Sequence, residues 1–367
     1  DPIELELGPF HWSVNGPLKF ILRMDGETII RAAVEAGYVH RGIEKICENR
    51  PWNSLCVLAD RVDAEAAVFY EHALCMAIEE IGEIMVPKRA QAIRVMLSEL
   101  SRVSSHMAYI VRIARAVGAE AIVHYILRDR EKILDLFELL SGARFTVNFL
   151  RIGGVAADVS EGFIERTVEV CELIRSRLKE YNDLFSYNQA FLDRAAFLGV
   201  ITESLAVRSG MTGPNARASG LSFDCRTDTG YAGYDRLDLR AYIGKGESGV
   251  PGDAHDRYLI RLREIAQSLD LLKSIVDSIP LGEYQAIRLD PDFRLPVGEA
   301  YARAEGPRGM VACHVVSDGG TSPCRVQFRA PSVATMSLLP SLLEGVQLSD
   351  LPLLVASLDI CISEVDL

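Results

Sequence analysis

The chain has 367 residues, of which 49% are hydrophobic and 25% charged, so it can bury a substantial core and is not disordered. Its formal net charge of −12 disfavours binding to nucleic acid. No run of eighteen apolar residues is present, and no basic segment followed by an apolar one opens the sequence, so neither a membrane span nor a signal peptide is predicted.

The first predicted elements are strands. In residues 18–24 apolar side chains alternate with others, residues 25–27 contain Gly26, and an apolar run follows at 28–30. This pattern predicts a β-hairpin within a β region that spans residues 6–36. From about residue 60 the apolar period becomes helical.

Long helices are predicted over 87–118, 121–141, 159–187 and 254–279, with shorter ones in 190–208 and a functional loop over 209–253. Short strands return in 284–330, at 311–316 and 325–329, and a helical tail follows over 331–367. We therefore expect a single α+β domain over 1–367. Its long-helix bundle core, residues 60–280, is joined to a small antiparallel β domain formed from the N-terminal and C-terminal segments.

The eight cysteines contain no C-x-x-C pair, and several have apolar neighbours. We interpret most of them as small buried hydrophobic residues in a reducing compartment, with no disulfides and no iron–sulfur site of their own. The seven histidines include no H-E-x-x-H sequence. A histidine on a helix, such as His106, is most often a packing residue.

Residues 37–45 carry the densest group of polar side chains: Tyr38, His40, Arg41 and Glu44, bounded or interrupted by Gly37 and Gly42. One interpretation is an ordinary ion pair between Arg41 and Glu44, which are three residues apart on one helix face. The other is a group beside a redox centre, where a cation favours the reduced, more negative state and so raises the potential.

Together with many other segments, this motif resembles the large redox subunit shared by respiratory complex I (the 49-kDa or D type) and the group 4 energy-converting [NiFe] hydrogenases. The resemblance covers nearly the whole chain. It rests on residues 8–11, 37–45, 86–90, 99–106, 128–131, 141–144, 151–155, 218–224, 256–258, 316–320 and 357–366.

The resemblance also shows what has changed. The four cysteines that hold nickel and iron in the hydrogenases correspond here to Asp63, Ala66, Cys361 and Glu364, so one sulfur ligand of four is left and no metal is predicted. At the complex I quinone site, the loop histidine corresponds to Asn15, the tyrosine to Ala64 and the supporting aspartate to Ala116, while His11 is kept.

The connection between residues 279–283 and 306–309 is short, as it is in the energy-converting hydrogenases, whereas complex I subunits generally carry a longer insertion there. The sequence is thus closest in pattern to a hydrogenase-related member that lacks the metal ligands.

The resemblance implies the redox subunit of a membrane-bound, ion-translocating oxidoreductase with an NADH or ferredoxin-type donor. It would bind no cofactor alone but cradle the [4Fe–4S] cluster of an adjacent small subunit and pass electrons to a quinone or a sulfur compound. The implied site residues are His11, Asn15, Asp63, Ala64 and Cys361 at the acceptor; His40, Arg41 and His106 as tuners of the cluster; and Glu44, Glu71 and Glu364 for proton uptake.

The implied partners are a small [4Fe–4S] protein of the complex I B type, a protein of the C type, a ferredoxin-like subunit and a membrane protein of the H type. The chain would lie peripherally on the cytoplasmic face of the cell membrane. Two alternatives stay open: a non-catalytic coupling or scaffold subunit with a vestigial site, and an independent soluble enzyme.

Overall fold

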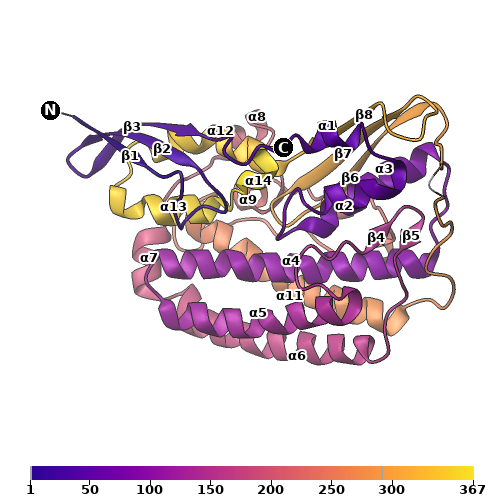
Figure 1. Ribbon diagram of the computed structural model, residues 1–367. Helices are drawn as coiled ribbons and strands as arrows, with labels where there is room; N and C mark the ends of the chain where they lie inside the picture. The colour runs from indigo at the N-terminus through magenta and orange to yellow at the C-terminus, as the bar shows by residue number, and fades with distance from the viewer. Residues whose placement is uncertain (1, 291) are drawn as a thin grey trace.

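The computed structural model describes residues 2–290 and 292–367, and it has the predicted α+β fold. Four long helices lie side by side, and two small sheets with shorter helices cover one edge of this bundle (Figure 1). The long helices are α4 (Lys88–Ala116), α5 (Glu120–Ser141), α6 (Phe163–Tyr181) and α11 (Ala254–Ser278). Within the described residues, no helix is both long and apolar enough to cross a membrane.

The ends of the long helices follow from local sequence. Pro87 directly precedes α4, where its fixed φ suits the start of a helix. Gly142 ends α5 in the left-handed conformation, which glycine adopts without steric cost. At the start of α11 the Asp253 side chain accepts a hydrogen bond from the Asp256 N–H. All four predicted long helices are present; α6 is shorter than expected, because the π-helical turn η2 (Asn182–Ser186) follows it.

The N-terminal and C-terminal segments form small antiparallel sheets, as predicted, each with three strands. The N-terminal sheet has the order β1-β2-β3, and the predicted hairpin is its β2–β3 pair. The C-terminal sheet has the order β6-β7-β8 and packs on α3, while β3 packs on α12. The strands are β1 (Ile3–Leu7), β2 (Lys19–Asp25), β3 (Thr28–Glu35), β4 (Leu150–Arg151), β5 (Gly154–Val155), β6 (Gly298–Glu305), β7 (Met310–Ser317) and β8 (Arg325–Arg329).

Shorter helices connect these layers, and several lie in the segment predicted as loop. They are α1 (Ile43–Cys47), η1 (Trp52–Ser54), α2 (Leu55–Ala59), α3 (Ala67–Ile81), α7 (Gln189–Ala195), α8 (Glu203–Arg208), α9 (Gly213–Ala218), α10 (Cys225–Asp228), η3 (Tyr234–Arg236), α12 (Pro331–Leu343), η4 (Leu348–Asp350), α13 (Leu351–Leu358) and α14 (Ile362–Val365).

Segments from the two ends of the chain meet beside the bundle. Asn15 and Cys361 form an isolated parallel bridge, in which the Ile362 N–H donates to the Asn15 carbonyl at 2.9 Å. Gly16 permits this approach, because a Cβ there would lie 2.8 Å from the Cβ of Ile362. The N-terminal loop is therefore held against the C-terminal segment next to α3.

Candidate functional site

The turn between α2 and α3 supplies two carboxylates to a buried site. Asp63 is 1% exposed and forms an ion pair with Arg308. Glu65 accepts hydrogen bonds from Arg308 Nη2 at 2.7 Å and from Arg112 Nη1 at 3.0 Å. The Glu65 N–H donates to Asp63 Oδ1 at 3.0 Å, so the two carboxylates are held in one local turn.

Arg308 lies at the centre of these contacts because the loop between β6 and β7 turns sharply. Gly309, with φ of 143°, packs so tightly that a Cβ would lie 2.7 Å from Thr212 Oγ1. The same hydroxyl accepts the N–H of Met310 at 3.0 Å. A glycine at this position is needed for the loop to seat against Thr212 and aim the guanidinium inward.

The C-terminal segment contributes a third carboxylate from a strained position. Asp359 ends α13 with φ of 55°, which is unusual for a residue other than glycine. Its Oδ1 accepts a hydrogen bond from Arg112 Nη2 at 2.6 Å, and Arg308 and Arg261 each approach it to 3.6 Å. These arginines hold the pKa of Asp359 below its ordinary value despite burial.

Glu364 is a buried carboxyl group of the site with a pKa near neutral. Its Oε2 accepts a hydrogen bond from the Tyr70 hydroxyl at 2.6 Å, and its Oε1 accepts the Ser332 N–H at 3.0 Å. Burial, followed by the charge of Asp63, raises the pKa of Glu364 to about 7. The site therefore contains one buried acid that can gain or lose a proton near neutral pH.

Cys361 is a buried thiol beside these charges. Its Sγ lies 3.1 Å from the Ser363 hydroxyl, and its N–H donates to Ser332 Oγ at 3.0 Å. Burial and the charge of Asp63 raise its pKa well above the ordinary value, so the sulfur stays protonated.

The four positions that correspond to hydrogenase ligands do not fit a nickel–iron centre. Ala66 has no donor atom, Asp63 is paired with Arg308, and Cys361 supplies the one sulfur. Within residues 2–290 and 292–367, no three or more His, Cys, Asp or Glu side chains are placed to hold a metal ion.

Asn15 joins this site, Ala64 lies between two of its residues in the chain, and His11 makes its contacts within its own loop and with β2. Asn15 Nδ2 donates to Glu65 Oε2 at 3.2 Å. The half-buried His11 contacts Ser13 at 2.8 Å, in the loop between β1 and β2. Ala64 is exposed and borders a depression whose other walls include α4 and α5.

The tuning residues lie in two places. His40 and Arg41 are exposed, and Arg41 donates to the carbonyls of Arg61 at 2.6 Å and Ser363 at 3.0 Å. The first of the two interpretations, an ion pair between Arg41 and Glu44, is not found among the described residues: α1 begins only at Ile43, and Glu44 pairs with Arg325 at 2.8 Å.

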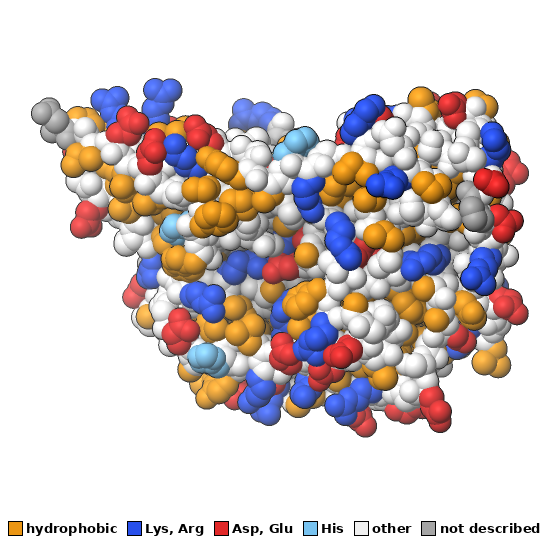
Figure 2. All heavy atoms as spheres, in the orientation of Figure 1, with side chains coloured by type: hydrophobic (Ala, Val, Ile, Leu, Met, Phe, Trp, Pro, Cys, Tyr) orange, Lys and Arg blue, Asp and Glu red, His pale blue; other side chains and the backbone are white. Residues whose placement is uncertain are grey.

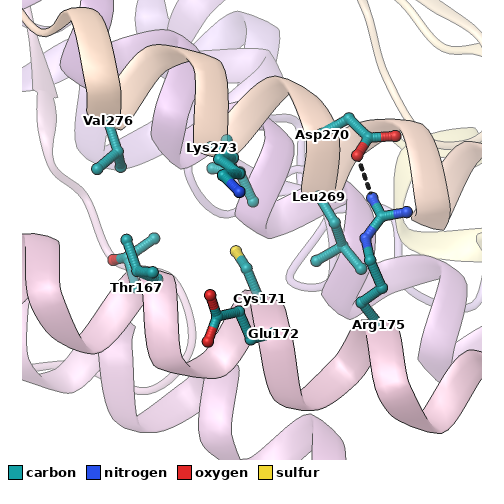
Figure 3. A pocket seen from close by; sticks show the side chains of 10 residues that line it. Thr167, Cys171, Glu172, Arg175, Leu269, Asp270, Lys273 and Val276 are labelled. Atoms are coloured by element: carbon teal, nitrogen blue, oxygen red, sulfur yellow. Dashed lines mark hydrogen bonds and ion pairs between the residues drawn. The ribbon is translucent and has the colours of Figure 1, made fainter.

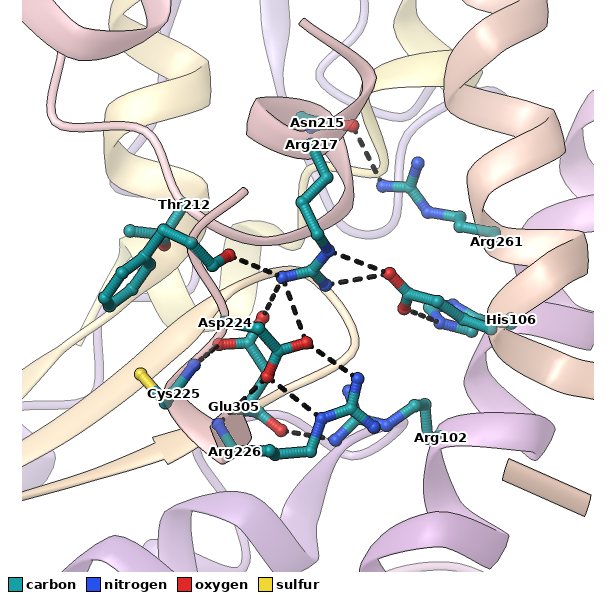
Figure 4. Close-up of polar contacts among 12 residues, drawn as sticks. Arg102, His106, Thr212, Asn215, Arg217, Asp224, Cys225, Arg226, Arg261 and Glu305 are labelled. Atoms are coloured by element: carbon teal, nitrogen blue, oxygen red, sulfur yellow. Dashed lines mark hydrogen bonds and ion pairs between the residues drawn. The ribbon is translucent and has the colours of Figure 1, made fainter. Parts of the chain in front are cut away.

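His106, in contrast, is fully buried inside the bundle. Its Nε2 lies 2.9 Å from Glu264 Oε2, in the large ion-pair cluster of Figure 4. Burial lowers the pKa of His106 to about 4, so the ring is neutral and acts as a hydrogen-bonding residue of the core.

The three predicted proton-uptake residues also occupy separate places. Glu71 is buried on α3 and accepts the Leu150 N–H at 2.8 Å, and burial raises its pKa well above the ordinary value. Glu44 lies at α1 beside β8, and Glu364 lies at the site. Among the described contacts, no hydrogen bond joins any two of the three.

Five residues of the site were not predicted from the sequence: Glu65, Tyr70, Arg112, Arg308 and Asp359. Two of them stand in segments compared with the family above, Arg308 in 306–309 and Asp359 in 357–366. A charged residue inside a glycine-rich turn was the available signal for Arg308. Tyr70 gave no signal, because its partner Glu364 is 294 residues away.

The fold and the site define a class: an α+β redox-subunit fold in which the ends of the chain close a buried site of carboxylates, arginines and one thiol. Residues 116–292 and 286–367 match the family described as respiratory-chain NADH dehydrogenase, 49 Kd subunit. The chain belongs to this 49-kDa family of complex I proteins.

Several known proteins resemble the chain along their full length. It is 38% identical to the D subunit of NADH-quinone oxidoreductase from Desulforamulus reducens and 39% identical to that from Carboxydothermus hydrogenoformans. Each match covers 99% of this chain and 97% and 98%, respectively, of those proteins. The fold also matches one chain of the membrane-bound sulfane sulfur reductase, an archaeal respiratory membrane complex, with a TM-score of 0.95 and 33% identity over 100% of this chain and 99% of that one.

Proposed function

We propose that the chain is the redox subunit of a membrane-bound, ion-translocating complex of the complex I type. It cradles the terminal [4Fe–4S] cluster of a small partner protein and passes electrons to an acceptor at the site formed by Asn15, Asp63 and Cys361. Membership of the 49-kDa family supports the role, and the relatives named above are parts of oxidoreductases.

The observation that carries this proposal is the pair of Glu364 and Tyr70. Reduction of a quinone or of a sulfur chain consumes protons as well as electrons. A buried carboxyl with a pKa near 7, hydrogen-bonded to a phenol at 2.6 Å, suits proton delivery at neutral pH. Tyr70 supplies a phenol at this site, although Ala64 occupies the position of the family's tyrosine.

Two further buried atoms are available to an acceptor. Arg308 Nε and Asp359 Oδ2 make no hydrogen bond within the described part of the chain. Unpaired buried polar atoms are costly, so one donor and one acceptor beside Asp63 favour the binding of a polar group there. A quinone carbonyl or a terminal sulfur anion could take the donor.

The position of Arg41 supports docking of the cluster-bearing partner at this edge. The exposed guanidinium is anchored on the carbonyls of Arg61 and Ser363, close in sequence to Asp63 and directly before Glu364, respectively. A cluster placed against it would lie near the site and be held at a higher potential by the positive charge. His40 is exposed in the same segment.

The surface is consistent with a chain that forms part of an assembly. Acidic and basic side chains mix over the long helices, and hydrophobic ones gather below the N-terminal strands (Figure 2). Phe10 and Trp12, in the loop between β1 and β2, are 86% and 49% exposed.

We assign the partners as a small [4Fe–4S] protein of the B type, a protein of the C type, a ferredoxin-like protein and a membrane protein of the H type, at the cytoplasmic face of the cell membrane.

The test is Glu364→Gln in the purified assembly. With the cluster reduced by its donor, we expect reduction of added quinone or polysulfide to slow at least tenfold, about 1.4 kcal/mol in barrier. Reduction of the cluster itself should be unchanged. Glu344→Gln, at an exposed position after α12, is the matched control.

An unchanged rate of acceptor reduction in Glu364→Gln would favour the second candidate, a non-catalytic coupling or scaffold protein. One observation supports that candidate: Asp63 and Cys361 are each 1% exposed and enclosed by ion pairs. Extraction of bound small molecules from the native assembly distinguishes the catalytic candidate from the scaffold candidate. A catalytic site should release a stoichiometric quinone or sulfur species, and a scaffold should release none.

A further inference from the structure

Two of the eight cysteines face each other across α2 and α3. The sulfur atoms of Cys56 and Cys75 lie 3.6 Å apart, and this is the one thiol pair within hydrogen-bonding distance in residues 2–290 and 292–367. Both thiols are free. A disulfide requires an S–S distance of about 2.05 Å, so the sulfur atoms need to approach by about 1.5 Å.

Cys56 also lines a cavity of about 420 Å³. Its walls include Arg151 and Arg288, and no carboxylate is among its lining residues. The lining residues Asn53 and Arg288 are exposed, so small solutes can enter from solvent. Both thiols are buried, Cys56 at 2% exposed and Cys75 at 0%, but only Cys56 lines the cavity, so a reagent there meets Cys56 first.

The two thiols are unequal. A hydrogen bond from Cys75, aided by the charges of Arg151 and Arg94, lowers the pKa of Cys56. The pKa of Cys75 is raised well above its ordinary value by that hydrogen bond and by burial. This asymmetry suits a pair in which one thiolate attacks an oxidant and the second thiol resolves the product.

We propose that Cys56 and Cys75 form a redox-active dithiol, which hydrogen peroxide entering the cavity converts to a disulfide between α2 and α3. The Cys56 thiolate attacks one peroxide oxygen, the O–O bond breaks, and the leaving oxygen takes a proton to become water. The Cys75 thiol then displaces the hydroxyl of the Cys56 sulfenic acid, forming the S–S bond and a second water. Two thiols lose two electrons and the peroxide gains them.

The disulfide would act on the candidate site through the loop that it closes. Residues 56–75 include Asp63 and Glu65, which bind Arg308, and Tyr70, which binds Glu364. Tying the ends of this loop restricts its local opening. The inference concerns the thiol pair itself, so it does not depend on which acceptor the site reduces.

The experiment is peptide mapping of the intact assembly after treatment with hydrogen peroxide. We expect the tryptic peptide of residues 46–61 to be linked to the tryptic peptide of residues 62–88 by a bond that dithiothreitol cleaves. Because peptide 46–61 also carries Cys47, tandem mass spectrometry has to assign the bond to Cys56. In Cys75→Ala, a sulfenic acid at Cys56 should become trappable by dimedone.

Cys171 provides the matched control. It lines a smaller groove of about 160 Å³ between α6 and α11, where Figure 3 shows its sulfur without a second cysteine among the lining side chains. Burial raises its pKa to about 12, so it should stay reduced at the same peroxide dose.

Three results would overturn the proposal: Cys56 and Cys75 alkylated as fully as Cys171 after oxidation, a bond from Cys56 to Cys47, or oxidised Cys56 without a cross-link. The wild-type assembly answers all three, so the test does not depend on the folding of any variant. A second measurement checks the consequence: hydrogen exchange in residues 57–74 should slow on oxidation and recover on reduction, and an unchanged exchange rate would refute the effect on the loop.

Discussion

The protein buries charge in two places, and the two places differ in what the charge can do. The core cluster joins α4, α9, α10, α11 and β6 inside the fold (Figure 4). It consists of Glu99, Arg102, Arg217, Asp224, Arg226, Glu264 and Glu305. The site cluster joins the C-terminal segment to the turn between α2 and α3, to α4 and to the loop before β7. It consists of Asp63, Glu65, Arg112, Arg308, Asp359 and Glu364.

In the core cluster most carboxylates are held charged. The flanking arginines lower the pKa of Glu99 to about 2 and place that of Glu264 well below its ordinary value. Glu305 is the exception, because burial raises its pKa. It accepts hydrogen bonds from Arg217 at 2.7 Å and from the Cys225 N–H at 3.1 Å. Such a cluster fixes the relative positions of helices and changes little with pH.

In the site cluster burial raises the pKa of Asp63, which is paired with Arg308, and that of Glu364, which is not paired with an arginine. Glu364 is bound by a phenol and a backbone N–H rather than by an arginine, and its neighbours Ser363 and Val365 are half-buried. The comparison teaches that burial and ion pairing alone do not mark a functional site. What marks it is a buried group whose charge can change near neutral pH, within reach of the surface.

The largest loss of stability should come from removing one carboxylate of the core cluster. Glu99→Gln removes the negative charge that faces Arg102 and Arg226 and weakens the hydrogen bond from Ser268 at 2.5 Å. Leaving guanidinium groups buried without a full partner should lower the free energy of unfolding by about 3–5 kcal/mol. Urea denaturation measures this, and Glu138→Gln, in an exposed pair with Arg144, should leave the midpoint unchanged.

The second effect is a pH dependence carried by Glu364. Its pKa is about 7 in the folded chain, against an ordinary value of 4.5, so the folded state binds the proton more tightly than the unfolded state does. Stability is therefore highest at low pH in this window, and about 3 kcal/mol should be lost as the pH rises from about 4.5 through 7. In Glu364→Gln, unfolding curves at pH 5 and pH 8 should give a smaller change in the free energy of unfolding than in the wild type. An equal change in both proteins would contradict the assignment of this pH dependence to Glu364.

A smaller effect should follow Tyr70→Phe. The tyrosine hydroxyl stabilises the charged form of Glu364, so its loss should move the pKa of Glu364 further upward, by roughly one unit. The pH at which stability falls should shift by the same amount. Tyr187→Phe removes a comparable but exposed hydrogen bond to Glu247, and it should shift nothing.

The smallest expected effect is a change in the reduction potential of the partner's cluster when the exposed Arg41 is removed. Arg41→Ala should lower the reduction potential of the partner's cluster, because a positive charge next to the cluster is lost. An EPR-monitored redox titration of the assembly measures it. Arg31→Ala, at an exposed position on β3, is the control, and equal potentials in both variants would place Arg41 away from the cluster.

Much of the fold could be predicted because its signals are local. The stripe over 87–118, ended by Gly118, became α4, and the alternation at 18–24 became β2. Small antiparallel sheets at both ends of the chain were predicted, but the strand order within each sheet was not, since alternation gives strand faces and not partners. Likewise the helices α9 and α10 are too short to show a period in the segment predicted as loop.

The site was predictable only in part. The resemblance pointed to Asn15, Asp63, Cys361 and Glu364, and the structure brings these residues together. It also pointed to His106, whose ring lies beside Glu264 of the core cluster. Tyr70 and Arg112 carry no local signal, because their roles arise from partners more than 40 residues away in the chain.

By itself, the sequence determined the long helices, the β-hairpin and the family, because each depends on residue type and short-range spacing. The tertiary structure alone decided which charges meet. It placed Glu364 against Tyr70, paired Asp63 with Arg308, and brought Cys56 to Cys75. Protonation and thiol chemistry depend on burial and on distances of a few ångströms, and these are properties of the folded chain.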